Sequence, residues 1–307
     1  MPLKIVEISE KGVDIDEIEQ LLFGGAKVAV SSKLKDKVTK SFHFLQEFSV
    51  DKVIYGVNTG FGPMAQYHIK DEEINQLQYN IIRSHSVGAG PPIEPVYVKS
   101  AMIDRLCTFA PGYSGIHPAL IQTLIDFINF DINPYVPSHG SVGASGDLVQ
   151  LAHIALALIG EGEVFYNGKL HPTADVMKQT GIEPFKLHIR EGLALTNGTS
   201  MMTGVGLVNL ILTRKLLHHA LVASAMMNEI AQSYDDFLAP ELNGVKRHNG
   251  QVETAAFMRE WLKDSELLRN RKKELYNGTK ASHFKQKVQP YYSLRCVPQV
   301  LGPVWDT

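Results

Sequence analysis

The segment 139–153 reads HGSVGASGDLVQLAH, in which glycine recurs at every third position from 140 to 146 before the sequence turns apolar. Glycine-rich loops that open onto a helix commonly bind phosphate, but the P-loop pattern needs a lysine where this loop has Asp147. The dinucleotide fingerprint G-x-G-x-x-G is also absent. The simplest interpretation is a tight turn in which Asp147 is the N-cap of a helix that begins near Leu148.

A second interpretation of the same loop is chemical. If the loop is strained so that the Gly146 nitrogen faces the Ala144 carbonyl, the backbone can close a five-membered ring, and glycine suits the attacking position because it has no Cβ. Loss of water from Ser145 then leaves an exocyclic methylene, an electrophile made from the chain itself. The N-terminus of the following helix would favour negative charge on the ring oxygen. The spacing alone does not decide between the two interpretations.

Five blocks of the sequence, in order, identify a family resemblance. GSVGASGDL resembles the signature of the aromatic amino-acid ammonia-lyases and aminomutases, which carry the 4-methylidene-imidazol-5-one (MIO) group. YGVNTGFG, SHSVGAG, GLALTNGTS and VQPYYSLRCVPQVLGP resemble further family blocks, so the resemblance covers essentially the whole chain. It is greatest toward bacterial histidine and tyrosine ammonia-lyases. It implies that the MIO forms autocatalytically from Ala144, Ser145 and Gly146, without metal or nucleotide, and that ammonia is eliminated from an aromatic amino acid to give a trans-arylacrylate.

The resemblance also implies catalytic roles for three further residues. Tyr55, in IYGVNTGFG, matches the family's catalytic base, and a tyrosine must be activated to accept a proton near neutral pH. Asn197, in ALTNGTS, matches the asparagine that holds the amine side of the substrate or the MIO oxygen; without the family it would be an ordinary Asn-Gly turn. Tyr292 matches a second active-site tyrosine.

Substrate-binding roles follow in the same way. Arg295 matches the arginine that binds the substrate carboxylate, to which its planar fork is suited, and its apolar neighbours in LRCVPQV predict burial and pairing. Gln289 matches a glutamine near the MIO, although Pro290 follows where the family often has Asp. Gly62 would let the Tyr55 loop approach the substrate closely.

His85 bears on the choice of substrate. Phenylalanine-specific relatives place an apolar pair at this position, many tyrosine enzymes have His-Leu, and histidine enzymes have Ser-His, as this chain does. Other blocks, such as NTGFGPMAQY, resemble bacterial tyrosine ammonia-lyases that also carry Ser-His. An imidazole can hydrogen-bond a phenol or another imidazole. His85 therefore excludes a purely apolar pocket, and tyrosine to p-coumarate is favoured slightly over histidine to urocanate.

Secondary-structure elements that position these residues are mainly helical. Apolar spacing predicts two helices within residues 14–50, and others over 72–83, 95–110, 117–130 and 200–234. Short strands are expected near 52–57 and 163–170. The segment 200–234 is apolar nearly all round, which predicts burial inside a bundle. We expect a mainly α, fumarase/aspartase-like ammonia-lyase fold, with an N-terminal domain over 1–199 that carries the MIO loop, and the start of a central helical bundle over 200–307.

Composition excludes several classes of protein. The 307 residues carry a net charge of −2, so no basic field for nucleic acid is present. Two distant cysteines and the lack of a signal peptide indicate a cytoplasmic protein, and the longest apolar run, LVQLAHIALALIG, is too short to cross a membrane. The histidines show no metal-binding spacing such as His-Glu-x-x-His.

The resemblance also bears on assembly. The family forms a homotetramer whose active sites mix residues of neighbouring subunits, so Tyr55 and Arg295 would reach the MIO of another chain. The sequence stops abruptly at Thr307, where the family continues, and we expect a truncated chain that self-associates and is nearly inactive. Two alternatives to the lyase stay open: a 2,3-aminomutase, in which the same MIO returns the amine to the β-carbon, and a non-catalytic lyase fragment that acts only as a helical assembly module.

Overall fold

The computed structural model describes residues 4–278, 280–284 and 287–307, and the chain divides into two compact units, Met1–Asn209 and Leu210–Thr307. The helix that was expected to open the second domain, α9 (Ser200–Ile230), contributes residues 200–209 to the first unit and the rest to the second.

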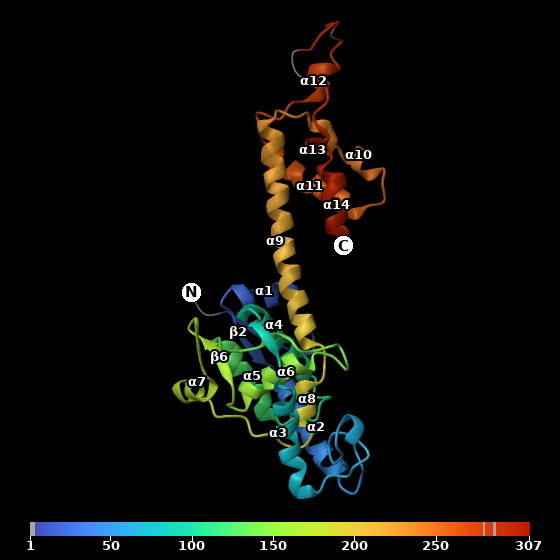
Figure 1. Ribbon diagram of the computed structural model, residues 1–307. Coiled ribbons are helices and arrows are strands. Elements are labelled where there is room, and N and C mark those ends of the chain that lie inside the picture. Colours follow the sequence, from blue (N-terminus) through green and yellow to red (C-terminus); the bar gives the residue numbers. More distant parts are fainter. Residues whose placement is uncertain (1–3, 279, 285–286) are drawn as a thin grey trace. The chain divides into compact units, whose positions relative to one another are not determined.

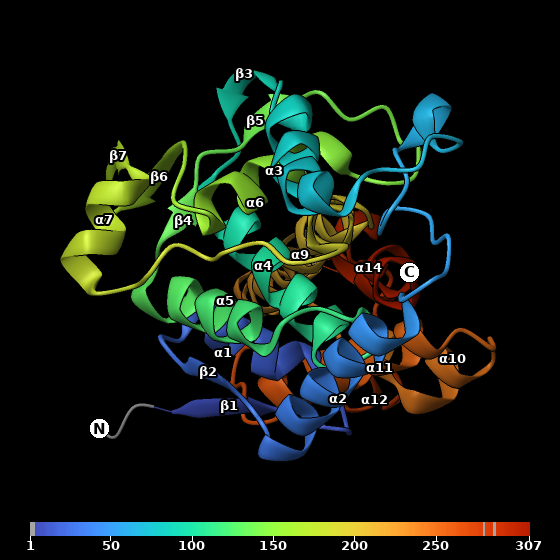
Figure 2. The ribbon, with the colours of Figure 1, turned by 90° about the horizontal axis from the view of Figure 1, so that it is seen from below.

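Helices of the first unit surround one apolar core. They are α1 (Ile15–Phe23), α2 (Ser32–Phe48), α3 (Ile74–His85), α4 (Pro95–Phe109), α5 (Pro118–Phe130), α6 (Leu148–Leu158), α7 (Thr173–Thr180) and α8 (Glu191–Thr196). α4 packs against α5, while α3, α6 and α8 pack against one another (Figures 1 and 2). Fully buried leucine and isoleucine side chains from α4, α5 and α6 fill the core. The mainly helical class expected from the sequence is confirmed.

Short strands complete the first unit. They are β1 (Ile5–Ile8), β2 (Lys27–Val30), β3 (Ala89–Pro92), β4 (Asn133–Pro134), β5 (Pro137–His139), β6 (Glu163–Tyr166) and β7 (Lys169–Pro172). β1 and β2 are parallel, with Ile5 opposite Lys27; β3 pairs with β5, and β6 lies between β4 and β7. The β6–β7 hairpin turns at Asn167 and Gly168, both with positive φ, as an Asn-Gly turn requires. It is the strand region expected near 163–170.

The strand expected over 52–57 is wrong. The Asn58 side chain organises this segment as a turn instead, because its Oδ1 accepts from the Ile54 nitrogen at 2.8 Å and its Nδ2 donates to the Lys52 carbonyl at 2.6 Å. The Ile54 carbonyl accepts in turn from the nitrogens of Val57 and Asn58. The backbone groups that a strand would need are thus used locally, as Asn side chains favour in turns.

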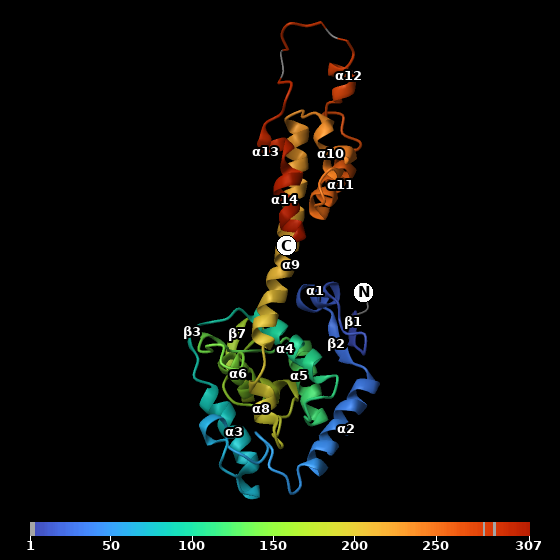
Figure 3. The same ribbon diagram turned by 90° about the vertical axis from the view of Figure 1, so that its right-hand side faces the viewer.

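The second unit is a small helical cluster built on the remainder of α9. Its other helices are α10 (Pro240–Gly244), α11 (Asn249–Leu262), α12 (Arg271–Leu275), α13 (Tyr292–Arg295) and α14 (Val297–Asp306). Figure 3 shows α14 running beside α9, with α10 and α11 next to them. α11 and α14 approach closely at two glycines: a Cβ on Gly250 would lie 2.1 Å from the Gly302 carbonyl oxygen. The Asp306 carboxylate accepts from the Gly250 nitrogen at 2.6 Å and fixes this contact.

The long helix α9 ends at Ile230, four residues before the expected end, and much of its apolar surface is exposed. Leu216 and Ile230 are 70 % and 68 % exposed, so burial all round is not achieved within this chain. Among the described residues α9 is the helix that by length and composition could cross a membrane, but core helices of soluble proteins pass the same test.

Candidate functional site

The triplet Ala144-Ser145-Gly146 lies in a strained turn between two glycines. Gly143 and Gly146 form an isolated antiparallel bridge that closes the turn around Ala144 and Ser145. Ser145 has φ +63°, a left-handed conformation that is uncommon for a residue with a Cβ and that clusters at functional sites. Its side chain is exposed. The triplet therefore lies in a strained turn of the backbone.

Gly146 cannot be replaced by a residue with a Cβ unless the backbone at Gly198 moves. It bridges to Gly198, and a Cβ at Gly146 would lie 2.1 Å from the Gly198 carbonyl oxygen. Gly146 also has φ +105°, which L side chains rarely adopt. This contact places Asn197, the residue before Gly198 and the C-cap of α8, directly beside the triplet.

The simplest interpretation of the sequence expected the Asp147 side chain to cap α6. The structure contradicts this expectation, because the Asp147 side chain makes no capping hydrogen bond to α6. It stands at the N-cap position, but its Oδ2 accepts from the Met202 nitrogen in the first turn of α9 at 2.8 Å. The Ser141 hydroxyl instead accepts from the Val149 nitrogen at 3.0 Å and takes over the capping of α6. Because the Asp147 nitrogen also donates to the Gly198 carbonyl at 2.8 Å, this residue ties the turn to α9 and to the end of α8.

Tyr55 and Gly62 are brought together in one loop. The Gly62 nitrogen donates to the Tyr55 hydroxyl oxygen at 3.3 Å, and the Tyr55 ring packs edge-on against Phe61. Tyr55 is half exposed. The loop rests on α8, because a Cβ at Gly56 would lie 2.4 Å from Leu193, one helical turn before Asn197. α8 is therefore the support shared by the Tyr55 loop, Asn197 and the triplet.

His85 ends α3, which packs against the same helix α8. The His85 Nδ1 lies 2.8 Å from the Ile81 carbonyl oxygen, and the ring is half-buried. A Cβ at Gly192 of α8 would lie 2.6 Å from Ile81, so the two helices touch one turn below His85. Just beyond α3, the Gly88 nitrogen donates to Nε2 of His153 on α6.

Three predicted residues cluster in the second unit. The Gln289 amide oxygen, in the orientation that satisfies both side chains, accepts from Arg295 Nε at 3.1 Å and Nη2 at 2.5 Å. The Arg295 guanidinium lies 4.6 Å from the centre of the Tyr292 ring. Arg295 is half-buried and paired, with a planar guanidinium able to receive a carboxylate. Gln289, Tyr292 and Arg295 thus form one group, as Tyr55 and Gly62 form another in the first unit.

Comparison with known proteins identifies the family. The model of the aromatic amino acid lyases matches residues 13–307. The chain belongs to the aromatic amino acid lyase family. It is 36 % identical to the histidine ammonia-lyase of Geobacillus sp. (strain WCH70) over 303 residues, which are 98 % of this chain and 57 % of that protein.

Solved structures of lyase-family relatives share the fold. The tyrosine aminomutase of Streptomyces globisporus superposes with a TM-score of 0.88 at 32 % identity, over 98 % of this chain and 58 % of that one. The phenylalanine aminomutase of Pantoea agglomerans gives 0.88 at 31 % identity, over 99 % and 60 %. The chain thus spans less than two thirds of the length of these relatives.

Two buried charged residues of this lyase chain were not singled out from the sequence, and they lie at opposite ends of α8. Arg105 contacts the C-terminal end. It falls on the apolar stripe of α4 that includes Val98, Met102 and Phe109, so a charge on a buried helix face was the available signal. Glu191 at the N-terminal end is a lone acid after a loop, which carries no comparable signal.

The Glu191 carboxylate ties two segments to the start of α8. Its Oε1 accepts from the His117 nitrogen and its Oε2 from the His188 nitrogen, each at 2.6 Å, and the side chain is fully buried. The His117 and His188 rings stack 4.4 Å apart. Burial raises the pKa of Glu191 to about 7 and lowers the pKa values of both histidines. Burial therefore favours the neutral form of the Glu191 carboxyl and of both imidazoles.

Glu191→Gln is expected to change how stability depends on pH. Between the ordinary pKa of 4.5 and the folded pKa of about 7, the folded chain holds a proton that the unfolded chain releases, so this group's contribution to stability falls as pH rises through that window. The glutamine variant has no such titration and should gain on the parent by up to about 3 kcal/mol from pH 4.5 to 7. Urea unfolding followed by circular dichroism measures this difference. A difference that stays constant with pH would contradict it, and the exposed Glu94→Gln serves as the control.

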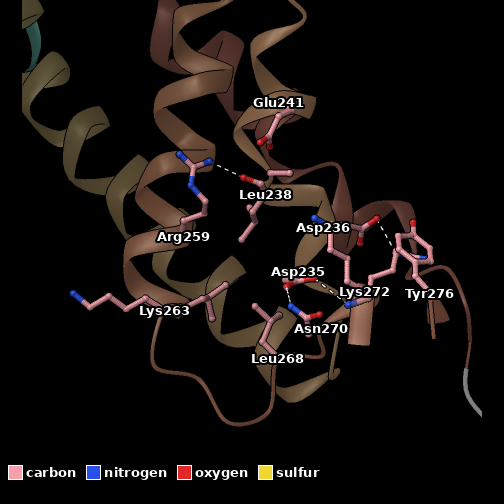
Figure 4. Close-up of a pocket in the computed structure, with 13 residues that line it drawn as sticks. Asp235, Asp236, Leu238, Glu241, Arg259, Lys263, Leu268, Asn270, Lys272 and Tyr276 are labelled. Atoms are coloured by element: carbon pink, nitrogen blue, oxygen red, sulfur yellow. Dashed lines mark hydrogen bonds and ion pairs between the residues drawn. The ribbon is translucent and has the colours of Figure 1, made fainter. Parts of the chain in front are cut away.

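A pocket in the second unit contains none of the predicted site residues. Figure 4 shows its charged lining, in which two of the carboxylates are paired: Asp235 accepts from the Asn270 side chain and the Arg271 nitrogen, and Asp236 pairs with the Arg271 guanidinium at 2.8 Å. Arg259 donates to the Leu238 carbonyl. This pairing is internal to the unit and occupies the carboxylates of Asp235 and Asp236. Over the described part of the chain, no group of His, Cys, Asp and Glu side chains has metal-binding geometry.

Proposed function

We propose that this chain carries the MIO-forming site of an aromatic L-amino-acid ammonia-lyase. The observation that supports it most is the turn at Ala144-Ser145-Gly146, in which Ser145 has positive φ and Gly146 is locked against Gly198. A plain helix-capping loop needs neither feature. The residues present therefore fit the MIO group.

The cyclisation balances without any co-reactant. The Gly146 nitrogen bonds to the Ala144 carbonyl carbon and passes its proton to that oxygen. The resulting hydroxyl leaves as water with the Ser145 amide proton, and the Ser145 hydroxyl leaves as a second water with the Cα hydrogen. The N-terminus of α6 lies two residues further on and favours negative charge on the ring oxygen.

In the proposed lyase reaction the MIO supplies the electrophile that makes the substrate's amino group a better leaving group. Tyr55 of a neighbouring copy of the chain removes the β-proton, and the Gly62 N–H at its oxygen stabilises the charge that a proton-accepting phenolate carries. Arg295 of a neighbouring copy of the chain, as the family assembly implies, binds the carboxylate, with Gln289 and Tyr292 of that copy holding its guanidinium. Asn197 holds the amine side. The α-C–N and β-C–H bonds break, the C=C bond forms, and ammonium and a trans-arylacrylate leave.

For the substrate we propose an aromatic amino acid with a polar ring. The half-buried His85 imidazole offers a hydrogen bond to a phenol or an imidazole. The expectation of tyrosine over histidine stays a prediction, and the similarity to proteins named histidine ammonia-lyase favours histidine. An assay of tyrosine, histidine and phenylalanine for arylacrylate absorbance and ammonia release tests the function. Product from none of them, by a chain whose triplet has cyclised, would favour the assembly-module alternative.

His85→Phe is expected to shift ring preference toward phenylalanine. A polar ring would lose its partner and leave a buried polar group unpaired, which costs about 1–3 kcal/mol, or roughly ten- to hundredfold in kcat/KM. The ratios of kcat/KM for the three amino acids in both forms measure this shift. His153→Phe, on α6, is the comparison variant, and unchanged ratios in His85→Phe would remove this residue from the pocket.

An aminomutase is the second candidate. The two aminomutase structures superpose on 98 % and 99 % of this chain with TM-scores of 0.88, which supports a site of the same class. An aminomutase returns the amine to the β-carbon after the same elimination. Chromatographic detection of a β-amino acid in the assay mixture distinguishes it from a lyase.

We further propose that the chain self-associates through the exposed apolar face of α9, as the family homotetramer implies. Leu212 and Leu216 lie one turn apart and are 44 % and 70 % exposed. Leu212→Lys with Leu216→Lys should lower the molar mass measured by light scattering, because lysines desolvate poorly at an interface core. Phe44→Lys, an equally exposed aromatic residue on α2, should leave it unchanged. A monomeric parent chain would contradict this proposal.

A further inference from the structure

Arg105 is a buried guanidinium whose hydrogen-bond partners are backbone carbonyls, with Asp104 and Asp147 as charged neighbours. It lies on α4, is 5 % exposed and sits over the Phe109 ring at 5.1 Å. Its Nη2 donates to the Leu195 carbonyl at 3.0 Å and to the Asn197 carbonyl at 2.6 Å. Burial lowers its pKa to about 10, so it remains charged at neutral pH. Burying a charge is costly unless the group is paired and hydrogen-bonded, so the partners of Arg105 are important for its place in the fold.

The carbonyls that Arg105 binds belong to Leu195, in the last turn of α8, and to Asn197, its C-cap residue. The final carbonyls of a helix have no partner within it and carry the negative end of its dipole, so a cation there satisfies and stabilises them. Arg105 thereby fixes residues 195–197 at the point where the chain leaves the helix. The Arg105 guanidinium also packs closely against the next residue, Gly198, since a Cβ at Gly198 would lie 2.7 Å from Arg105 Nη1.

On its other side, the same short segment holds the candidate reactive turn. The Gly198 carbonyl accepts from the Asp147 nitrogen at 2.8 Å, and Gly198 bridges to Gly146 in parallel register. No space remains at this contact, as the 2.1 Å approach of a Cβ at Gly146 to the Gly198 oxygen shows. A continuous set of contacts thus runs from Arg105 through Asn197 and Gly198 to Gly146, whose nitrogen is the attacking atom of the cyclisation.

We infer that Arg105 is a positioning residue for MIO formation: through the end of α8 it holds the Gly146 nitrogen against the Ala144 carbonyl. The inference rests on the proposed function. Arg105 does not touch the reacting atoms, and it acts by keeping the Gly198 carbonyl where it restrains Gly146 and Asp147. Ring closure depends steeply on the approach of nitrogen to carbon, so loss of this restraint slows cyclisation even in a folded chain.

Intact-mass measurement of the whole chain tests this inference, because cyclisation removes two water molecules. In Arg105→Met the converted fraction at a fixed time after synthesis should fall roughly tenfold or more, while helical circular dichroism is retained. Arg105→Lys, which keeps a cation near the carbonyls, should recover part of the loss. Arg190→Met is the matched control, because Arg190 is also a partly buried arginine that donates to a backbone carbonyl, that of Ser114 at 2.5 Å. The triplet of this variant should cyclise as fast as that of the parent chain.

The outcomes separate the inference from the proposed function. Full conversion of a folded Arg105→Met chain would overturn the positioning role. If that variant does not fold, Arg105→Gln, which is neutral and keeps an amide NH2 as donor, replaces it, and full conversion there would overturn the inference equally. If cyclisation is slowed equally in Arg190→Met, the effect of Arg105 is explained by a general loss of stability, and the positioning role is contradicted. A parent chain without the mass loss would instead contradict MIO formation itself.

Discussion

Ser145→Ala is expected to abolish MIO formation, because Ser145 carries the hydroxyl whose loss gives the methylene. The variant should lack the ultraviolet difference absorbance of the MIO against the parent and should produce no arylacrylate. Helical content should stay the same, since the Ser145 side chain is exposed and donates no hydrogen bond that holds an element in place. Circular dichroism and absorbance on the same sample measure both properties.

Ser145→Cys is the matched companion of this variant. A thiol can also be eliminated, so the cysteine chain should keep part of the absorbance that the alanine chain lacks. Ser141→Ala removes a hydroxyl from the same loop, one that accepts from the Val149 nitrogen, and should still form the MIO. A Ser145→Ala variant with the turnover of the parent chain would rule out the MIO mechanism.

Tyr55→Phe is expected to lower kcat by about 10²–10⁴ if Tyr55 is the general base, with little change in the substrate dissociation constant. The hydroxyl that the Gly62 nitrogen contacts is the group removed, while the ring that packs against Phe61 remains. The rate of arylacrylate release relative to the parent chain measures the effect. The 90 % exposed Tyr113, changed to Phe, should retain the parental rate. Near-normal kcat in Tyr55→Phe would reassign Tyr55 to packing.

Long periodic segments were predictable from the sequence, because apolar spacing is a local signal. The helices expected over 95–110 and 117–130 are found at Pro95–Phe109 and Pro118–Phe130. The expected strand at 52–57 failed because one side chain, Asn58, captures the backbone groups of its neighbours. The parallel pair β1–β2 was missed, since two short strands that pair across a helix leave no pattern beyond four residues each.

The residues of the candidate site also differ in how far the sequence could predict them. The triplet and its glycines could be predicted because a motif carries them. The hydrogen bond of the Asp147 side chain could not be predicted, because its partner, the Met202 nitrogen, lies 55 residues away in sequence. Arg105 and Glu191 act on backbone groups of distant segments, and such contacts are visible only once α4, α5 and α8 are packed. The strain at Ser145 likewise appears only in the folded loop.

The mass of the peptide that contains residues 144–146, released from the purified chain by proteolysis, tests the central claim most directly. MIO formation predicts a mass below that of Ala-Ser-Gly in sequence by two water molecules, located to these three residues by fragmentation. The unmodified mass, in a chain whose circular dichroism shows folded helices, would contradict the account.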